Sequence, residues 1–355
     1  MSLVTTLADA ERLTPWLDVN VPELGNGPLS VGQIHNGTSN VVLTLDRGGG
    51  CEMILRRPPE VPPPGSEKAV LREARVLSAL NGTQVPHPYC HAVCADADVI
   101  GAPFYVMERV PGWSATLLGD RIVHPAPFDQ APSEYGIAYA VVDGLVALAN
   151  VDFKSIGLEG FGKPENFLER QVDRWEGQIR SYPQLYGSEW REIAGYAYSR
   201  DWLRANIPDD FRPGVIHGDV GTPNALFAYD RPARLNALID WELSTIADPL
   251  IDLAWFTGRF RDEQRPDLIY DDALYNVANL PTRQEMARYY AAGTGRDMAN
   301  FDFYCILAAF KCACILEYKV AQSSVGMMSP DVGKLFDKLV RGDFARAETL
   351  ARARG

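Results

Sequence analysis

The amino-acid sequence predicts an α+β protein with two lobes, a small β-rich N-lobe and a larger, mostly helical C-lobe, with the active site in the cleft between them. Two observations predict this division. Residues 31–110 contain several short strand-like segments around a single helical segment. Beyond residue 111 apolar residues recur mostly at helical spacing, apart from a strand- and loop-like stretch at 213–241. We therefore expect an N-terminal helix and loop at 1–30, an N-lobe at 31–110 and a C-lobe at 111–355.

The expected N-lobe begins with three strands. The segment VGQIHNGTSNVVLTLDRGGGCEMILRR, residues 31–57, offers three strand-like pieces separated by the turns GTSN and RGGG. A proline-rich loop follows, and SEKAVLREARVLSAL at 66–80 has apolar positions at helical spacing, with Ser66 as its N-cap. The remaining elements are two short strands and an upstream amphipathic helix, expected at about 89–95, 103–110 and 7–17.

The expected C-lobe is built from helices. They are expected at 133–150, 164–182, 187–206, 283–292, 301–323 and 330–352. The exception is 213–241, where VIHGDV, ALFAY and LNALIDW indicate short strands and loops. The Pro-containing segment at 113–135 is a hypothetical lid.

Charge and composition narrow the class of protein. The 355 residues include 46 acidic and 34 basic ones, a formal net charge of −12. No nucleic-acid partner is expected, because phosphate neutralisation needs a basic face. The net charge is still compatible with a local cationic pocket for a phosphorylated ligand. No run approaches the roughly 18 apolar residues of a membrane helix, and the N-terminus lacks a secretory pattern. The six cysteines form no CxxC pair, so free thiols in a cytoplasmic protein are expected, with no membrane partner.

The stretch VIHGDVGTPN concentrates polar residues in ten positions. His217, Asp219 and Asn224 have the spacing H-x-D-x4-N, which matches the catalytic loop of kinases. Phosphoryl transfer needs a group that orients the attacking hydroxyl and oxygen ligands for magnesium, and Asp219 and Asn224 could supply them. The alternative is an ordinary polar turn, since turns rich in Asp, Asn and Gly are common.

A second acidic segment, LIDWELSTIADPLIDLAW, follows at 238–255. Three apolar residues lead directly into Asp240, as in a buried strand that ends at a cleft, and this carboxylate could be a second magnesium ligand. Asp248 and Pro249 then indicate a helix start, as N-cap and first helical residue. Asp252 lies one turn further on an apolar helix. If it is buried, the backbone of the catalytic loop could supply its donors; otherwise it is an exposed helix acid.

The N-lobe contains candidate phosphate-binding groups. The turn HNGTSN at 35–40 could cradle them with amide and hydroxyl groups, or be a plain hairpin. In MILRRPP, Arg56 and Arg57 lie on opposite faces of a strand, and one of them could contact the α- and β-phosphates. Glu73 of the following helix could pair with that arginine, or lie exposed among neighbouring charges.

Together these motifs resemble the aminoglycoside phosphotransferase-like family of small-molecule kinases, which have a protein-kinase-like fold. The branch most similar to them is the phosphotransferase domain fused to some acyl-CoA dehydrogenases. The resemblance covers about residues 30–320 and is carried by IHGDVGTPN, IDWELSTIADPLIDLAW, LRRPP, REARVLSAL and IGAPFYVMERVPG. It implies ATP and Mg²⁺ as cofactors and a small molecule with a hydroxyl group as acceptor.

The resemblance also implies residue roles. Asp219 corresponds to the catalytic base, and Asn224 and Asp240 to the magnesium ligands. The nucleotide-binding group is expected to comprise Thr38, Ser39 and Asn40 of the phosphate loop, Arg56 with its partner Glu73, and the hinge backbone from Glu108 to Val110. Three further residues are expected to support the site: His217 braces the loop, Glu242 lies near the metals, and Asp252 anchors the loop.

Two departures from the kinase pattern bear on function. Arg56 stands where many kinases have Lys, and Arg keeps its charge and binds phosphate bidentately. Only seven residues separate Asp240 from Asp248, which leaves no room for a protein-kinase activation segment and argues against a peptide substrate.

The identity of the acceptor stays open at this point. The segment FDFYCILAAFKCACILEYKV at 301–320 is largely apolar, with Lys311 and Lys319 among aromatic residues. This favours a hydroxyacyl-CoA or hydroxy acid over a cationic aminoglycoside, although plain core packing also explains the pattern. The alternatives are an aminoglycoside or other antibiotic kinase and, from another class, an inactive pseudokinase that serves as a binding scaffold. The choice of ATP over GTP is not determined by these motifs.

Overall fold

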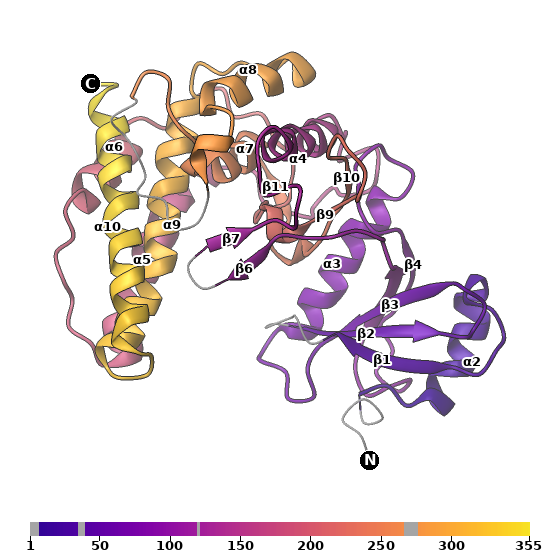
Figure 1. Ribbon diagram of the computed structural model, residues 1–355. Coiled ribbons are helices and arrows are strands. Elements are labelled where there is room, and N and C mark those ends of the chain that lie inside the picture. Colours follow the sequence, from indigo (N-terminus) through magenta and orange to yellow (C-terminus); the bar gives the residue numbers. More distant parts are fainter. Residues whose placement is uncertain (1–6, 35–39, 119–120, 266–275) are drawn as a thin grey trace.

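The N-terminal part of the protein is an antiparallel sheet flanked by helices. The computed structural model describes residues 7–34, 40–118, 121–265 and 276–355 (Figure 1). The sheet has the strand order β1-β2-β3-β5-β4, and every neighbouring pair in it is antiparallel. Its elements, in chain order, are α2 (Ala10–Asn20), β1 (Ser30–Ile34), β2 (Val41–Asp46), β3 (Glu52–Arg57), α3 (Ser66–Leu80), β4 (Cys90–Cys94) and β5 (Phe104–Glu108).

Strand alternation gives this sheet two different faces. On β3, Met53 and Leu55 belong to a core shared with Leu13 and Leu17 of α2. The opposite face of the sheet contributes Tyr105 to the large core that α3 joins, and Arg56 pairs with Tyr105 in the β3–β5 register. Because side chains alternate along a strand, β3 presents apolar residues to α2 and Arg56 to the side of α3.

The C-terminal part is mostly helical, with short strand pairs near its junction with the sheet. In Figure 1 the sheet and the bundle of α5, α9 and α10 lie at opposite ends, with α3 and the short strands between them. The helices are α4 (Ser133–Ala149), α5 (Phe167–Tyr186), α6 (Tyr196–Ala205), α7 (Leu250–Phe256), α8 (Arg283–Thr294), α9 (Phe301–Ser324) and α10 (Pro330–Arg352). The strands are β6 (Thr116–Leu118), β7 (Arg121–Val123), β8 (Gly214–Ile216), β9 (Ala225–Phe227), β10 (Leu235–Leu238) and β11 (Thr245–Ala247), which pair as β6–β7, β8–β11 and β9–β10.

The two-lobed α+β architecture predicted from the sequence is confirmed, whereas several element ends were predicted wrongly. Ser66 is not the N-cap of α3: that position is Gly65, with a φ of 90°, and the Ser66 hydroxyl donates to the Pro63 carbonyl. The N-cap of α7 is Pro249 rather than Asp248, although the Asp248 carboxylate accepts from Leu250 N–H. The helix predicted at 187–206 begins only at Tyr196, after Gly195 in a left-handed conformation.

All six cysteines are free thiols. Within the ranges that the structure describes, no helix is both long and apolar enough to cross a bilayer.

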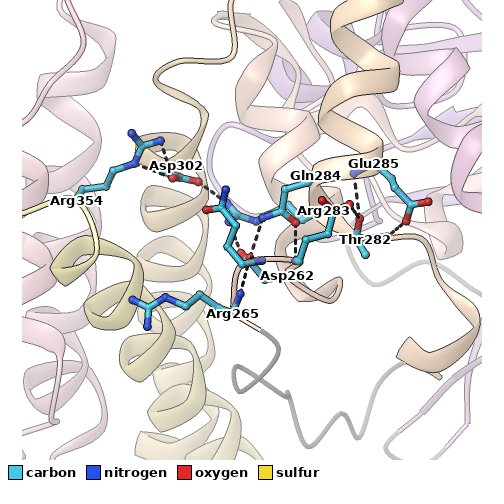
Figure 2. Close-up of polar contacts among 10 residues, drawn as sticks. Asp262, Arg265, Thr282, Arg283, Gln284, Glu285, Asp302 and Arg354 are labelled. Carbon is cyan, nitrogen blue, oxygen red and sulfur yellow. Dashed lines mark hydrogen bonds and ion pairs between the residues drawn. The ribbon is translucent and has the colours of Figure 1, made fainter.

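A buried ion network ties α8 to α9 and to the C-terminal end of the chain. Arg283, the first residue of α8, donates to Asp302 of α9 at 2.7 Å and to Asp262 (Figure 2). Arg354 donates to the other Asp302 oxygen at 2.7 Å. The Arg283 and Asp262 side chains are only 4% and 2% exposed. Burial raises the pKa of the Asp262 carboxyl, but the charge of Arg283 outweighs this and holds that pKa below its usual range.

The Arg283→Met variant is expected to lose about 3–5 kcal/mol of unfolding free energy at neutral pH, because it leaves a buried carboxylate without its cation. Since the pKa of Asp262 is lowered in the folded state, its stabilising contribution is present at neutral pH and lost on acidification. The difference from wild type should therefore narrow below about pH 4. Urea unfolding at several pH values measures this.

The matched control is Arg288→Met on the same helix, since Arg288 is 64% exposed and pairs with Glu263. Its effect should be much smaller than that of Arg283→Met, as for other exposed pairs. Equal destabilisation by the two variants would contradict the assignment of a buried network.

Candidate active site

The polar loop at 217–224 follows the buried strand β8 and is held against the segment after β10. The Ile216–Thr245 pair of β8 and β11 brings the two segments side by side. Gly218 has a φ of +89°, and a Cβ there would lie 2.5 Å from the Leu243 carbonyl oxygen. Because L-residues avoid this conformation and no space exists for a side chain, glycine is required at this turn.

His217 connects this loop to the residue that precedes Asp240. Its ring is fully buried, its Nε2 lies 2.9 Å from the Ile239 carbonyl oxygen, and it packs on the Trp241 ring at 4.6 Å between centroids. Burial lowers the pKa of His217 to about 4, so the ring is neutral at physiological pH. Its contacts are those of a brace between two loops.

Asp252 of α7 binds the backbone of the same loop. Its carboxylate is 1% exposed and accepts from His217 N–H at 2.6 Å and from Gly218 N–H at 2.9 Å. Burial raises the pKa of Asp252 to about 6, although these two backbone donors favour the ionised form. The sequence-based alternative of an exposed helix acid is therefore wrong, and the loop donors expected for a buried carboxylate are present.

Asp219 and Asn224 are joined within the loop. The Asn224 side-chain NH₂ donates to the Asp219 carbonyl at 2.9 Å and to Asp219 Oδ2 at 3.1 Å, which leaves Asn224 Oδ1 for another partner. Ile239 N–H donates to the Asn224 carbonyl at 2.9 Å, so Asn224 lies next to the segment that carries Asp240. Burial raises the pKa of Asp219, whereas Lys311 and Asn224 favour its ionised form.

Asp240, Arg56 and Glu73 meet where the two lobes face each other. Arg56 Nη2 donates to Asp240 Oδ1 at 2.7 Å, and Arg56 Nε lies 3.1 Å from Glu73 Oε2. The other Glu73 oxygen accepts from Trp241 N–H at 3.2 Å. Burial raises the pKa of Glu73 to about 7, even though Arg56 opposes this. Asp240 itself has a φ of 67°, one of two non-glycine residues with positive φ in the described ranges, a conformation that often marks functional positions.

The structure distinguishes the two arginines of β3. Arg57 lies on the opposite face of the sheet, where its guanidinium donates to the carbonyls of Leu7 and Ile100, the latter at 2.9 Å. Arg56 alone of the two lies with the acidic residues, and Glu242 Oε2 is 3.6 Å from its Nη2. Of the two sequence-based candidates for phosphate contact, only Arg56 faces the candidate site.

The remaining nucleotide-binding candidates lie at the edges of the site or outside the described residues. Thr38 and Ser39 fall outside the described ranges, and Asn40 directly precedes β2. Glu108 ends β5, and its N–H already donates to the Tyr89 carbonyl at 2.8 Å. The base of a nucleotide bound at this segment would therefore have to contact other backbone groups between Glu108 and Val110.

Sequence reasoning missed three neighbours of the site. Tyr105 lies beside Arg56 and Glu73 and influences the pKa of both; the alternation of FYVME could have placed it on the face of Arg56. Lys311 Nζ donates to the Gly218 carbonyl at 3.1 Å. Trp255 forms a wall of the cavities beside Asp219. Lys311 was noticed as a cation in an apolar helix, but no local pattern links it to a loop 93 residues earlier.

Comparison with known proteins decides the family. The sequence matches the Phosphotransferase enzyme family (APH) over residues 30–289. The chain belongs to this family. Acyl-CoA dehydrogenase family member 11 of Gallus gallus is 31% identical over 327 residues, which cover 90% of this chain and 40% of that protein. The chain thus spans about two fifths of the length of such relatives.

Solved structures of phosphotransferases share the fold of this family member. A protein of Ralstonia eutropha JMP134, provisionally named an aminoglycoside phosphotransferase, superposes with a TM-score of 0.76 at 30% identity, over 96% of this chain and 98% of that one. A thermostable mutant of aminoglycoside phosphotransferase APH(4)-Ia, in a ternary complex with AMP-PNP and hygromycin B, has a TM-score of 0.55 at 16% identity, over 97% and 99% of the two chains. The kinase-like fold and the family predicted from the motifs are confirmed.

The Asp252→Ala variant is expected to loosen strand β8 and the loop after it, residues 214–224, because the N–H groups of His217 and Gly218 lose their acceptor. Leaving buried donors unsatisfied costs about 1–3 kcal/mol, so amide exchange in this segment should accelerate. Hydrogen exchange followed by mass spectrometry measures it.

Asp331→Ala is the control, since Asp331 occupies the first turn of α10 and its side chain is 93% exposed. It should leave exchange at 214–224 unchanged. Unaltered exchange in Asp252→Ala would show that the two hydrogen bonds do not hold the loop.

Proposed function

We propose that the protein is an ATP- and Mg²⁺-dependent phosphotransferase that transfers the γ-phosphoryl group to a hydroxyl of a small molecule. The observation that carries this proposal is the proximity of Asp219, Asn224 and Asp240, the last of which is paired with Arg56. These groups come from β3, the loop after β8 and the turn after β10. Membership of the phosphotransferase family supports the reaction class.

The side chains fit a magnesium ion. Asn224 donates its NH₂ to Asp219, so its Oδ1 is available, and the Asp240 side chain is 38% exposed. No cluster of three or more His, Cys, Asp or Glu suited to a metal occurs among the described residues. A site with few protein oxygens suits Mg²⁺, which is typically held by one or two carboxylates together with waters and substrate phosphates. When bound, Mg²⁺ would neutralise charge that develops during transfer.

The nucleotide is proposed to lie under the sheet, against Arg56. The guanidinium is held by Glu73 and Asp240, which fixes its position, and a planar guanidinium binds phosphate oxygens bidentately. The fold neighbour APH(4)-Ia was solved with AMP-PNP, an analogue of ATP, which supports ATP as donor. Thr38, Ser39 and Asn40 are proposed to complete the phosphate grip.

Asp219 is proposed to orient the acceptor hydroxyl and take its proton. Its Oδ2 accepts from Asn224, and the Trp255 side chain also lies within reach of the carboxylate, so both would orient it toward the hydroxyl. Asp252 and His217 hold the loop backbone. The position of the Asp219 backbone is therefore set by other residues and does not depend on the contacts of its own carboxylate. General-base help of this kind contributes about 10²–10⁴-fold to rate.

The acceptor is proposed to have an apolar body, with a hydroxyacyl-CoA or hydroxy acid favoured. A cavity of about 600 Å³ begins at Asp219 and runs between α9 and α10. Its apolar walls include Trp255, Phe256, Leu316, Leu335, Phe336 and Leu339. Cationic, polyhydroxylated aminoglycosides would gain little from such walls, whereas an aliphatic chain gains about 25 cal/mol for each Å² removed from water.

The Asp219→Asn variant is expected to lower kcat by about 10²–10⁴-fold while nucleotide affinity stays close to that of wild type. Release of ADP with an acceptor that wild type phosphorylates gives kcat, and calorimetry with AMP-PNP gives the affinity. Asp230→Asn is the control, because the Asp230 side chain is 80% exposed. Unchanged turnover in Asp219→Asn would overturn the assignment of the base, and nucleotide binding without turnover by wild type would favour the scaffold alternative.

An acceptor panel is expected to separate apolar hydroxyl compounds from antibiotics. Hydroxyacyl-CoAs and hydroxy acids with aliphatic chains should give Mg²⁺-dependent release of ADP, and chelation with EDTA should abolish it. Aminoglycosides and amino alcohols should give little. Turnover of an aminoglycoside alone would overturn the preference for an apolar acceptor and leave the reaction class intact.

A further inference from the structure

One cation beside Asp219 has no part in the proposed transfer. Lys311 lies in the middle of α9, half-buried, and its Nζ donates to the Gly218 carbonyl at 3.1 Å. The ammonium also lies 4.1 Å from the ring centroid of Trp255 and 5.5 Å from that of Trp175. No ion pair within 4 Å joins it to a carboxylate in the part of the chain that the structure describes.

An ammonium in this environment is costly unless it binds something. Burial lowers the pKa of Lys311, and the charges of Asp219 and Asp252 oppose that shift without contacting the group closely. An ammonium has three donors, and among the described residues only the Gly218 carbonyl accepts from this one. The two aromatic faces compensate the charge only in part. The remaining donors are therefore suited to an anionic ligand.

The cavity around Lys311 has the chemistry of an anion subsite. It has a volume of about 360 Å³ and is distinct in its lining from the apolar cavity described above, although both reach Asp219 and Trp255. Its polar lining includes Arg174 and the amides of Gln171 and Gln178. Arg174 is exposed at this cavity, stacks on Trp175 at 4.7 Å, and has no carboxylate partner among the described residues. In a chain with a net charge of −12, two cations at one cavity with no ion pair within 4 Å among the described residues form a local exception.

We propose that Lys311, assisted by Arg174, binds an anionic group of the acceptor and makes the enzyme selective for anionic hydroxyl compounds over neutral ones. The inference rests on the proposed function for its catalytic consequence, and it deepens that function by naming a specificity-determining residue. The anionic oxygens belong to a carboxylate in a hydroxy acid or to the phosphates in a CoA thioester. Lys311 does not act on the reacting hydroxyl; it fixes the charged end of the acceptor while the hydroxyl lies at Asp219.

The first test measures binding without turnover. Hexanoate, its methyl ester and CoA are titrated into the wild-type protein and into Lys311→Met, Lys311→Arg and Lys319→Met, with tryptophan fluorescence or calorimetry as readout. Lys311→Met should weaken the binding of hexanoate, of CoA or of both by about 10- to 100-fold, as expected for loss of a charged hydrogen bond. Lys311→Arg should retain most of the affinity. Lys319→Met, a control on the same helix, should match wild type.

The second test compares kcat/KM for a hydroxy acid, its methyl ester and its CoA thioester in the same proteins. A selective loss for the free acid in Lys311→Met identifies the carboxylate as the anion, and a selective loss for the thioester identifies the phosphates. An equal loss for all three, methyl ester included, would overturn the proposal, because it would mean that Lys311 only supports the Gly218 carbonyl. Unchanged binding of both hexanoate and CoA would overturn it as well. Binding that depends on Lys311 without phosphorylation of any compound would refute the proposed function and leave the anion subsite in place.

Discussion

The contact on which the rest of the candidate site depends is the ion cluster of Arg56, Glu73 and Asp240. It joins three separate segments, namely β3, α3 and the turn after β10. Glu73 is 1% exposed and accepts a further hydrogen bond from Trp241 N–H. Buried charges are stable only when they are paired and hydrogen-bonded, so the buried Arg56 and Glu73 depend on each other, and Asp240 gives Arg56 a second partner. The Arg56–Asp240 pair therefore connects the two lobes at the point where the donor phosphates are proposed to bind.

The loop that carries Asp219 is held by groups other than Asp219. Asp252 binds the loop backbone from α7, and His217 binds the carbonyl of Ile239, next to Asp240. Both of these side chains are buried, at 0% exposure for His217 and 1% for Asp252. The contacts that hold the loop are thus separate from the proton transfer proposed for Asp219, an arrangement expected where a catalytic carboxylate has to keep a constant orientation.

Local patterns in the sequence were enough to place the strands of the sheet, the loop with Asp219 and Asn224, and the helix with Asp252. Strand alternation also separated Arg56 from Arg57, but it could not say which face of β3 lies toward the C-lobe, because that depends on tertiary packing. The contact of Lys311 with Gly218 could not be predicted for the same reason, since it joins residues 93 positions apart. The cap at Gly65 was missed because left-handed glycine and a serine at the next position are equally compatible with a helix start.

The left-handed backbone of Asp240 has a consequence for the whole fold. A non-glycine residue in this conformation costs about 1–2 kcal/mol relative to glycine, and the carboxylate is what glycine cannot provide. The backbone conformation alone would favour glycine here, whereas the ion pair with Arg56 favours aspartate, so Asp240 is a point of local frustration. The role proposed for Asp240 as a magnesium ligand gives a reason why this strained conformation is retained. Substitutions that raise the melting temperature by relaxing this turn are therefore expected to be those that an active phosphotransferase cannot tolerate.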